Sequence, residues 1–220
     1  MMENRRLYLV RHGALIADEH HCFLGQLDVP LGRKGIAQAH ALHDRLQYST
    51  INRIYCSDLS RSHETATIIA DGSQIPIIPL WNLREISLGL WEGCAMADIA
   101  TRYPQAFKAR GEDIEHFRPP GGESFKDCRT RVLAALEEIL AYSNGDILIV
   151  GHAGVNRLIL CEALSIPISN LFKIKQEYGC LNVLECGDSG YRVSLLNFTP
   201  WNGMFAADHV LYAPEAIPVG

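Results

Sequence analysis

The chain lacks the paired cysteines that a structural metal site or a disulfide framework requires. Its seven cysteines are odd in number, are spread along 220 residues, and include no Cys-x-x-Cys pair. Disulfides stabilise small secreted proteins, whereas isolated cysteines are typical of buried free thiols in a reducing compartment. We therefore expect free thiols and no structural metal.

Long apolar runs and a strong net charge are also missing. No apolar run reaches the roughly 20 residues of a membrane-spanning helix, and the start of the chain has no apolar secretory signal. The formal net charge is -5, with 20% charged residues, so no basic excess indicates nucleic acid as a partner. We expect a cytoplasmic protein that binds neither membranes nor nucleic acid.

The chain does have enough apolar residues for one sizeable core, because 48% of its 220 residues are hydrophobic. Short β-rich runs alternate with helical periodicity, which favours a layered α/β domain. The predicted strands are residues 7–10, 53–56, 147–150, 180–185 and 191–196. Apolar residues at helical spacing predict helices within 36–46, 132–140 and 155–164.

A long stretch from about residue 84 to residue 145 interrupts this alternation. It contains helical patterns around a Pro- and Gly-rich loop at residues 118–122, and Ser124 with Asp127 resembles a capping box for the next helix. An excursion without strands predicts a cap over one end of the sheet. We expect a single domain, residues 1–220, with this cap subregion.

Two of the predicted strands end in a histidine. Residues 7–10 run into Arg11-His12-Gly13, and residues 147–150 run into Gly151-His152. A lone histidine after a strand is more often structural than catalytic. However, ligands of open α/β sheets collect at the carboxyl ends of strands, and two equivalent histidines there indicate a site. Neither histidine stands in a close metal-ligand pattern such as His-x-x-x-His.

Arg61 and Glu85 are candidates of a weaker kind. Arg61 follows a predicted strand, near a helix start that Ser57 or Asp58 can cap and whose free N–H groups attract anions. A solvated surface arginine is the alternative. Glu85 stands in an apolar, aromatic segment where desolvation favours a protonated acid. It can equally be a salt-bridge partner, and Glu92 is a competing candidate.

Taken together, these motifs closely resemble the histidine phosphatase superfamily, which includes the cofactor-dependent phosphoglycerate mutases. The resemblance covers about residues 5–197 and is carried, in order, by Leu9-Val10-Arg11-His12-Gly13, residues 25–31, Cys56-Ser57-Asp58-Leu59-Ser60-Arg61, Leu83-Arg84-Glu85, residues 120–124 and Val150-Gly151-His152-Ala153-Gly154. It implies a three-layer α/β fold, with a mostly parallel sheet, helices on both faces and a helical cap insertion.

The resemblance also implies a chemistry. His12 would accept the phosphoryl group, Glu85 would act as general acid and then base, and Arg11, Arg61 and His152 would supply positive charge. Such a ring of cations needs no metal or other cofactor. The implied substrate-binding residues are Arg11, Gly25, Arg61, His152 and Ala153, and the implied partner is a small phosphorylated substrate.

Two positions depart from the family pattern, which often has threonine and asparagine where this chain has Leu15 and Asp18. A carboxylate near the phosphate would repel it, so Asp18 is in doubt as a substrate contact. Residues 176–182 are similar to a segment of the alpha-ribazole phosphatase-like members. Substrate choice would come from the cap, whose aromatic and basic side chains would stack on and clamp the substrate. In the simpler reading, the same residues only pack the helices and form a solvated face. They are Arg102, Tyr103, Phe107, Lys108, Arg110, Phe117 and Arg118.

Two other functions stay open at this point. A phosphoglycerate mutase would pass the phosphoryl group to a second substrate position, although the cap here looks shorter than in such mutases. A catalytically silent sensor would bind a phosphorylated ligand without hydrolysing it. The oligomeric state is also open, with a homodimer as the working expectation.

Overall fold

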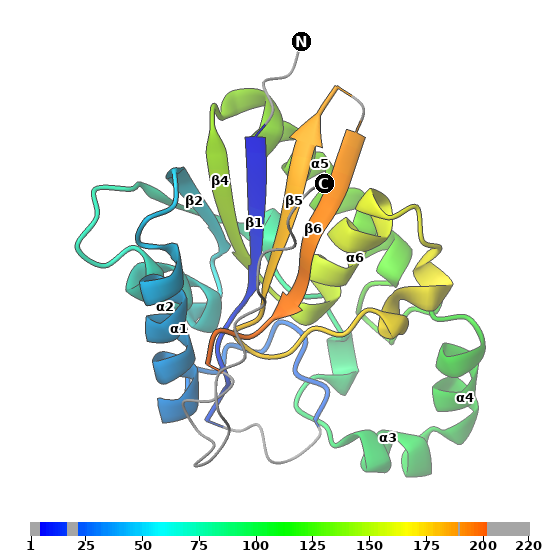
Figure 1. Ribbon diagram of the computed structural model, residues 1–220. Helices are drawn as coiled ribbons and strands as arrows, with labels where there is room; N and C mark the ends of the chain where they lie inside the picture. Colours follow the sequence, from blue (N-terminus) through cyan, green and yellow to red (C-terminus); the bar gives the residue numbers. More distant parts are fainter. Residues whose placement is uncertain (1–4, 17–21, 189, 202–220) are drawn as a thin grey trace, which may run out of the picture.

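The computed structural model describes residues 5–16, 22–188 and 190–201, which build one six-stranded sheet in the order β3-β2-β4-β1-β5-β6. β1, β2, β3 and β4 are parallel, β6 shares their direction, and β5 runs opposite to them (Figure 1). The strands are β1 (Arg5–Arg11), β2 (Ile51–Ser57), β3 (Ile77–Leu80), β4 (Asp146–Gly151), β5 (Leu181–Gly187) and β6 (Gly190–Phe198).

Helices cover both faces of the sheet. Tyr8 and Val10 pack with α1 (Arg33–Leu46) and α2 (Ser60–Ile69), whereas Leu7 and Leu9 pack with α5 (Phe125–Tyr142) and α6 (Ala153–Ala163). Successive strand residues point to opposite faces, so one apolar run serves two cores. The predicted three-layer α/β fold with a mostly parallel sheet is confirmed.

Two short helices lie apart from these layers, beyond the carboxyl end of β1: α3 (Met96–Arg102) and α4 (Pro104–Glu112) (Figure 1). The described residues also form the 3-10 turns η2 (Trp81–Leu83), η3 (Gly89–Trp91) and η4 (Ile168–Lys173). Although α5 falls within the predicted cap range, its apolar face belongs to the core over the sheet. The division into one domain with a cap at 84–145 stays a prediction.

Strand β3 is absent from the sequence-based prediction, and the reason is local. Pro79 lies inside it and Pro76 just before it, and proline is normally confined to edge strands. β3 is indeed an edge strand, paired with β2 alone. None of the helices in the described ranges is both long enough and apolar enough to cross a membrane.

Helix caps follow the sequence in one place and depart from it in another. The predicted capping box of Ser124 and Asp127 opens α5. The predicted cap of α2 by Ser57 or Asp58 is wrong, because the N-cap residue is Leu59 without a side-chain cap, and Asp58 forms a bidentate ion pair with Arg84. Asp28 instead accepts hydrogen bonds from the backbone N–H and the hydroxyl of Ser60 at the start of α2.

Candidate active site

A cavity of about 200 Å³ opens at the carboxyl end of β1. It brings together five of the predicted site residues: Arg11, His12, Gly25, Arg61 and Glu85. Apolar and aromatic residues, among them Leu15, Phe23, Ile86, Leu88 and Tyr178, form the rest of its wall. His152 is fully buried beside His12, outside this lining, and Ala153 directly follows it as the first residue of α6.

His12 presents a neutral imidazole with one defined lone pair. Its Nδ1 lies 2.8 Å from the carbonyl oxygen of Gly13. Because a carbonyl only accepts hydrogen bonds, Nδ1 carries the proton and Nε2 keeps its lone pair. Burial, followed by the charges of Arg11 and Arg61, holds the pKa of His12 well below its usual range. The ring is therefore uncharged at neutral pH and suited to act as a nucleophile.

The backbone around His12 is fixed on several sides. The N–H of His12 donates to the carbonyl oxygen of Gly151 at the end of β4, and its own carbonyl accepts from Gly179. The N–H of Gly13 donates to the hydroxyl of Thr65 in α2. A Cβ at Gly13 would lie 2.4 Å from the carbonyl oxygen of Gly35, so α1 approaches this loop as closely as two glycines allow.

Hydrogen bonds within the protein fix the side chain of Arg61, and only 2% of this residue is exposed. Its Nη1 and Nη2 donate to the carbonyl oxygens of Leu27 and Gly25, at 2.7 and 2.8 Å. Gly25 has a φ of +52°, which favours glycine, and a Cβ there would lie 2.4 Å from Oε1 of Glu92. The sequence motif at residues 25–31 therefore positions the guanidinium of Arg61.

His152 contributes a hydrogen-bond donor and no charge. The Nε–H of Arg61 donates to its Nδ1 across 3.3 Å, which leaves the proton on Nε2. Burial, followed by the positive charge of Arg61, lowers the pKa of His152 well below its usual range. The expectation that His152 adds positive charge is therefore wrong for the free protein, because a buried imidazole beside a guanidinium stays neutral.

Two buried donors in this region have no partner among the described residues: Nε2 of His152 and Nε of Arg11. Buried polar groups are nearly always hydrogen-bonded, so unmet donors indicate an acceptor from outside the protein. The rings of His12 and His152 have centroids 5.1 Å apart. Phosphoryl oxygens are acceptors that suit donors grouped around a nucleophile in this way.

Tyr178 is a site residue that sequence reasoning missed. Its ring centroid lies 3.5 Å from the guanidinium carbon of Arg11 and 5.4 Å from the ring of His12. The Nη1 of Arg11 also donates to the carbonyl oxygen of Gln176, at 2.7 Å. The segment before β5 thus orients Arg11, but its sequence shows only a resemblance to one subgroup and no chemical pattern.

Glu85 is held at the start of α6. Its Oε2 accepts from the N–H of Gly154 at 3.0 Å, and its Oε1 accepts from the N–H of Ile86 at 3.0 Å. The competing candidate Glu92 is occupied elsewhere, since its Oε1 accepts from the N–H groups of Gln26 and Leu88. The structure therefore favours Glu85 as the acid at the cavity, and Glu92 ties two loops together.

This geometry agrees with comparisons to known proteins. A model of the histidine phosphatase superfamily (branch 1) matches residues 7–199. The chain belongs to this superfamily. The family resemblance predicted from the motifs is confirmed, and the chain is an enzyme of the metal-independent histidine phosphatase class.

Several relatives of this histidine phosphatase carry more specific names. The adenosylcobalamin/alpha-ribazole phosphatase of Salmonella typhimurium is 31% identical over 193 residues, which are 87% of this chain and 96% of the relative. A probable phosphoglycerate mutase GpmB of Yersinia pestis is 33% identical over 163 residues, 74% of this chain and 76% of the relative. The crystal structure of a putative alpha-ribazole-5'-P phosphatase from Escherichia coli matches with a TM-score of 0.84 and 26% identity, covering 90% and 98% of the two chains.

The cap residues of this histidine phosphatase differ in their contacts. Lys108 pairs with Glu112, and Arg118 pairs with Asp127 at the capping box. The guanidinium of Arg110 lies 5.3 Å from the ring of Phe23, which is a residue of the cavity wall. Asp18, the departure from the family pattern, lies outside the described residues, whereas Leu15 adds an apolar side chain to the wall.

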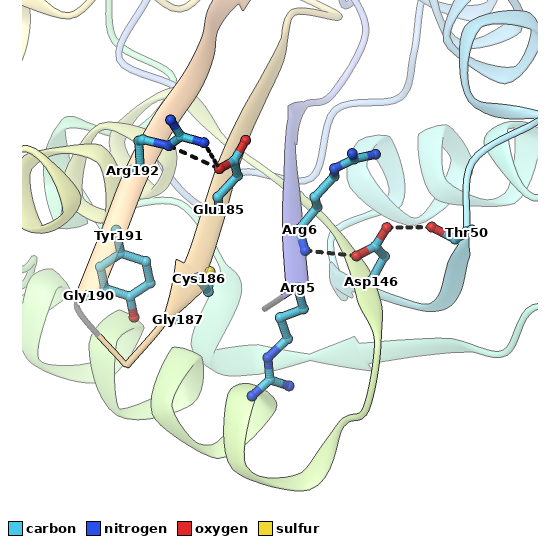
Figure 2. Close-up of a pocket in the computed structure, with 10 residues that line it drawn as sticks. All are labelled: Arg5, Arg6, Thr50, Asp146, Glu185, Cys186, Gly187, Gly190, Tyr191 and Arg192. Atoms are coloured by element: carbon cyan, nitrogen blue, oxygen red, sulfur yellow. Dashed lines mark hydrogen bonds and ion pairs between the residues drawn. The ribbon is translucent and has the colours of Figure 1, made fainter. Parts of the chain in front are cut away.

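A larger hollow, of about 770 Å³, lies at the opposite end of the sheet (Figure 2). Its charged groups already have partners, because Arg192 pairs with Glu185 and Asp146 accepts from Thr50 and from the backbone of Arg6. Burial raises the pKa of its Cys186 thiol to about 11, which disfavours a thiolate. Size alone would favour this hollow, and Nε of Arg5 in its wall also lacks a partner among the described residues, but the smaller cavity holds His12 together with Arg11, Arg61 and Glu85. In the described ranges, no group of three or more His, Cys, Asp and Glu side chains converges on a metal site.

Proposed function

We propose that this histidine phosphatase hydrolyses phosphate monoesters of small metabolites through a phosphohistidine formed on His12. The observation that carries the proposal is the pairing of an uncharged His12, whose Nε2 lone pair is available, with the adjacent guanidinium groups of Arg11 and Arg61. Phosphoryl transfer depends mainly on positioning and on fixed charges around the equatorial oxygens. This site supplies both.

The reaction would proceed in two steps. In the first, Nε2 of His12 attacks phosphorus in line while the bond to the leaving oxygen breaks, and Glu85 gives its proton to that oxygen. In the second, Glu85 takes a proton from water, whose oxygen attacks the phosphohistidine. Inorganic phosphate leaves, and both residues return to their starting states. Arg11, Arg61 and the Nε2–H of His152 would hold the phosphoryl oxygens throughout.

For the substrate, we propose alpha-ribazole 5'-phosphate as the first candidate. Two observations support it: the names of the relatives, and the aromatic residues of the cavity wall and its surroundings. Phe23 lines the cavity, and the guanidinium of Arg110 lies within 5.3 Å of its ring and 5.9 Å of the ring of Phe172. Aromatic faces and guanidinium planes are surfaces on which a planar base stacks.

A cytoplasmic location and a homodimer are further parts of this proposal.

The test uses a panel of esters and one trapped intermediate. Purified protein is expected to release phosphate from p-nitrophenyl phosphate and from alpha-ribazole 5'-phosphate without added metal, and to form an acid-labile phosphoenzyme. His12→Ala should abolish both signals. Turnover that persists in His12→Ala contradicts the proposed nucleophile, and failure to hydrolyse any ester favours the phosphate-ligand sensor.

The mutase is the second candidate, because a probable phosphoglycerate mutase is 33% identical to the chain. It differs from the phosphatase in the fate of the phosphoryl group. Incubation with 3-phosphoglycerate, with and without a bisphosphoglycerate primer, separates the two functions. Primer-dependent isomerisation faster than phosphate release would favour the mutase.

A further inference from the structure

Arg131, on the helix that covers the sheet, is hydrogen-bonded to the segment that carries Glu85. Its Nη1 donates to the carbonyl oxygens of Asn82 and Arg84, both at 2.8 Å, and its Nη2 donates to the carbonyl oxygen of Glu85 at 3.0 Å. One guanidinium therefore holds the backbone before and at Glu85. Three such bonds restrict the segment far more than a single contact would.

Glu123 completes the arrangement from the other side of Glu85. Its carboxylate accepts from Nε and Nη2 of Arg131, at 2.7 and 2.9 Å, and also from the N–H of Ser87, at 2.9 Å. The two side chains are only 11% and 20% exposed. A paired, bidentate and shielded ion pair is stronger and more directional than a surface pair.

The backbone and the carboxylate of Glu85 are thus held by different helices. Arg131 on α5, paired with Glu123 just before that helix, fixes the backbone, whereas the N–H of Gly154 on α6 fixes the carboxylate. Arg131 lies outside the cavity lining, so it does not contact a bound substrate, and its hydrogen bonds link it to the reaction through Glu85. Misplacement of a reacting group by about 1 Å can cost on the order of 100-fold in rate, so this support matters for catalysis.

We propose that Arg131 and Glu123 are positioning residues that set the place of Glu85 as the proton donor to the leaving group. The proposal rests on the proposed function of Glu85. It predicts how the rate of phosphorylation depends on the leaving group. A poorly positioned acid slows the departure of a basic alkoxide, which needs a proton, and hardly affects a nitrophenolate, which leaves without one.

The experiment measures kcat and KM for a series of phosphate monoesters, from 2,4-dinitrophenyl phosphate to alkyl phosphates, in the full-length protein. Arg131→Met is expected to lower kcat/KM, which reports only the phosphorylation step, by about 100-fold for the alkyl esters, on the scale of general acid catalysis. The loss in kcat/KM for the dinitrophenyl ester should be under about 5-fold, because its leaving group needs no proton. Arg129→Met is the matched control, because Arg129 lies on the same helix and pairs with Glu162 near the surface. It should keep the wild-type values throughout.

Glu85→Gln, measured on the same series, separates this proposal from the function on which it rests. If Glu85→Gln loses equally in kcat/KM on every ester, the assignment of Glu85 as the acid is wrong. If Glu85→Gln shows the steep dependence and folded Arg131→Met does not, the positioning role is wrong and Glu85 stands. Glu123→Gln keeps the shape of the pair and should show an intermediate dependence of the loss on the leaving group. This variant tests the proposal if Arg131→Met folds poorly. The double variant Glu85→Gln/Arg131→Met should be no slower than Glu85→Gln, and additive losses would overturn the proposal.

Discussion

The carboxylate of Glu85 meets the backbone N–H of Gly154 at 3.0 Å, at the first turn of α6. This contact requires residue 154 to have no side chain. A Cβ there would lie 2.4 Å from Oε1 of Glu85 and 3.4 Å from the ring of Phe125.

Gly154→Ala should therefore displace Glu85 and lower kcat on alkyl phosphates by about 10-fold or more, the lower range for a misplaced acid. Gly111→Ala provides the control, because a Cβ at Gly111 in α4 would have nothing within 4 Å. Steady-state kinetics of the two variants, beside their melting temperatures, check the prediction. Equal activity of both variants would show that the Glu85–Gly154 contact does not matter for turnover.

Arg61→Lys should be a severe change despite its conserved charge. A lysine has one ammonium group and cannot donate to Gly25, Leu27 and His152 together, as the guanidinium does. We expect kcat/KM to fall by at least about 100-fold, the cost of losing one preorganised donor. Arg53→Lys, at an exposed position of β2, should leave kcat/KM unchanged. A loss below 10-fold in Arg61→Lys would contradict the fixed role of the guanidinium.

Stability should depend on pH through His12 and His152. Burial, followed by neighbouring arginine charges, lowers the pKa of both, so below about pH 6.5 the unfolded chain binds more protons than the folded protein. The free energy of unfolding should then decrease as the pH falls below 6.5, by about 1.4 kcal/mol per pH unit for each histidine, and should be flat just above it. Urea unfolding at a series of pH values measures this slope. His12→Asn should reduce it, and an unchanged slope would contradict the burial of a neutral ring.

Ser124→Ala tests the capping box of α5 separately from the chemistry. The hydroxyl of Ser124 accepts from the N–H of Asp127, and its removal should cost about 1 kcal/mol of stability. The kcat of the folded variant should stay at the wild-type value, because neither residue lines the cavity. Ser124→Thr should retain most of the stability. Denaturant titration of both variants, beside their kcat values, decides the outcome.

The strand ends that carry His12 and His152 could be predicted because the signal is local. Each is an apolar run that stops at a histidine, and the register of β1 with β4 places Arg11 opposite Gly151. The neutrality of His152 could not be predicted, since it depends on complete burial beside Arg61. A sequence pattern reports which residue type is present, but not how much solvent remains around it.

Tyr178 and Arg131 escaped prediction for a different reason. Each acts on a residue that is distant along the chain, Tyr178 on Arg11 and Arg131 on the backbone of Glu85. Neither stands in a pattern that differs from ordinary core or surface residues. The same holds for Asp28, because the sequence shows the motif that contains it but does not predict its hydrogen bond with Ser60. Long-range contacts of this kind appear only once the fold brings the segments together.

The residues that hold phosphate and those that would face the rest of the ester come from separate stretches of chain. His12 and His152 directly follow strands of the sheet and Arg61 lies in the first turn of α2, whereas α3 and α4 lie on an excursion between β3 and α5 (Figure 1). We expect replacements within α3 and α4 to change which alcohol is accepted while His12, Arg61, Glu85 and His152 stay in place. A scaffold partitioned in this way can diversify across many metabolites by exchanging one peripheral segment.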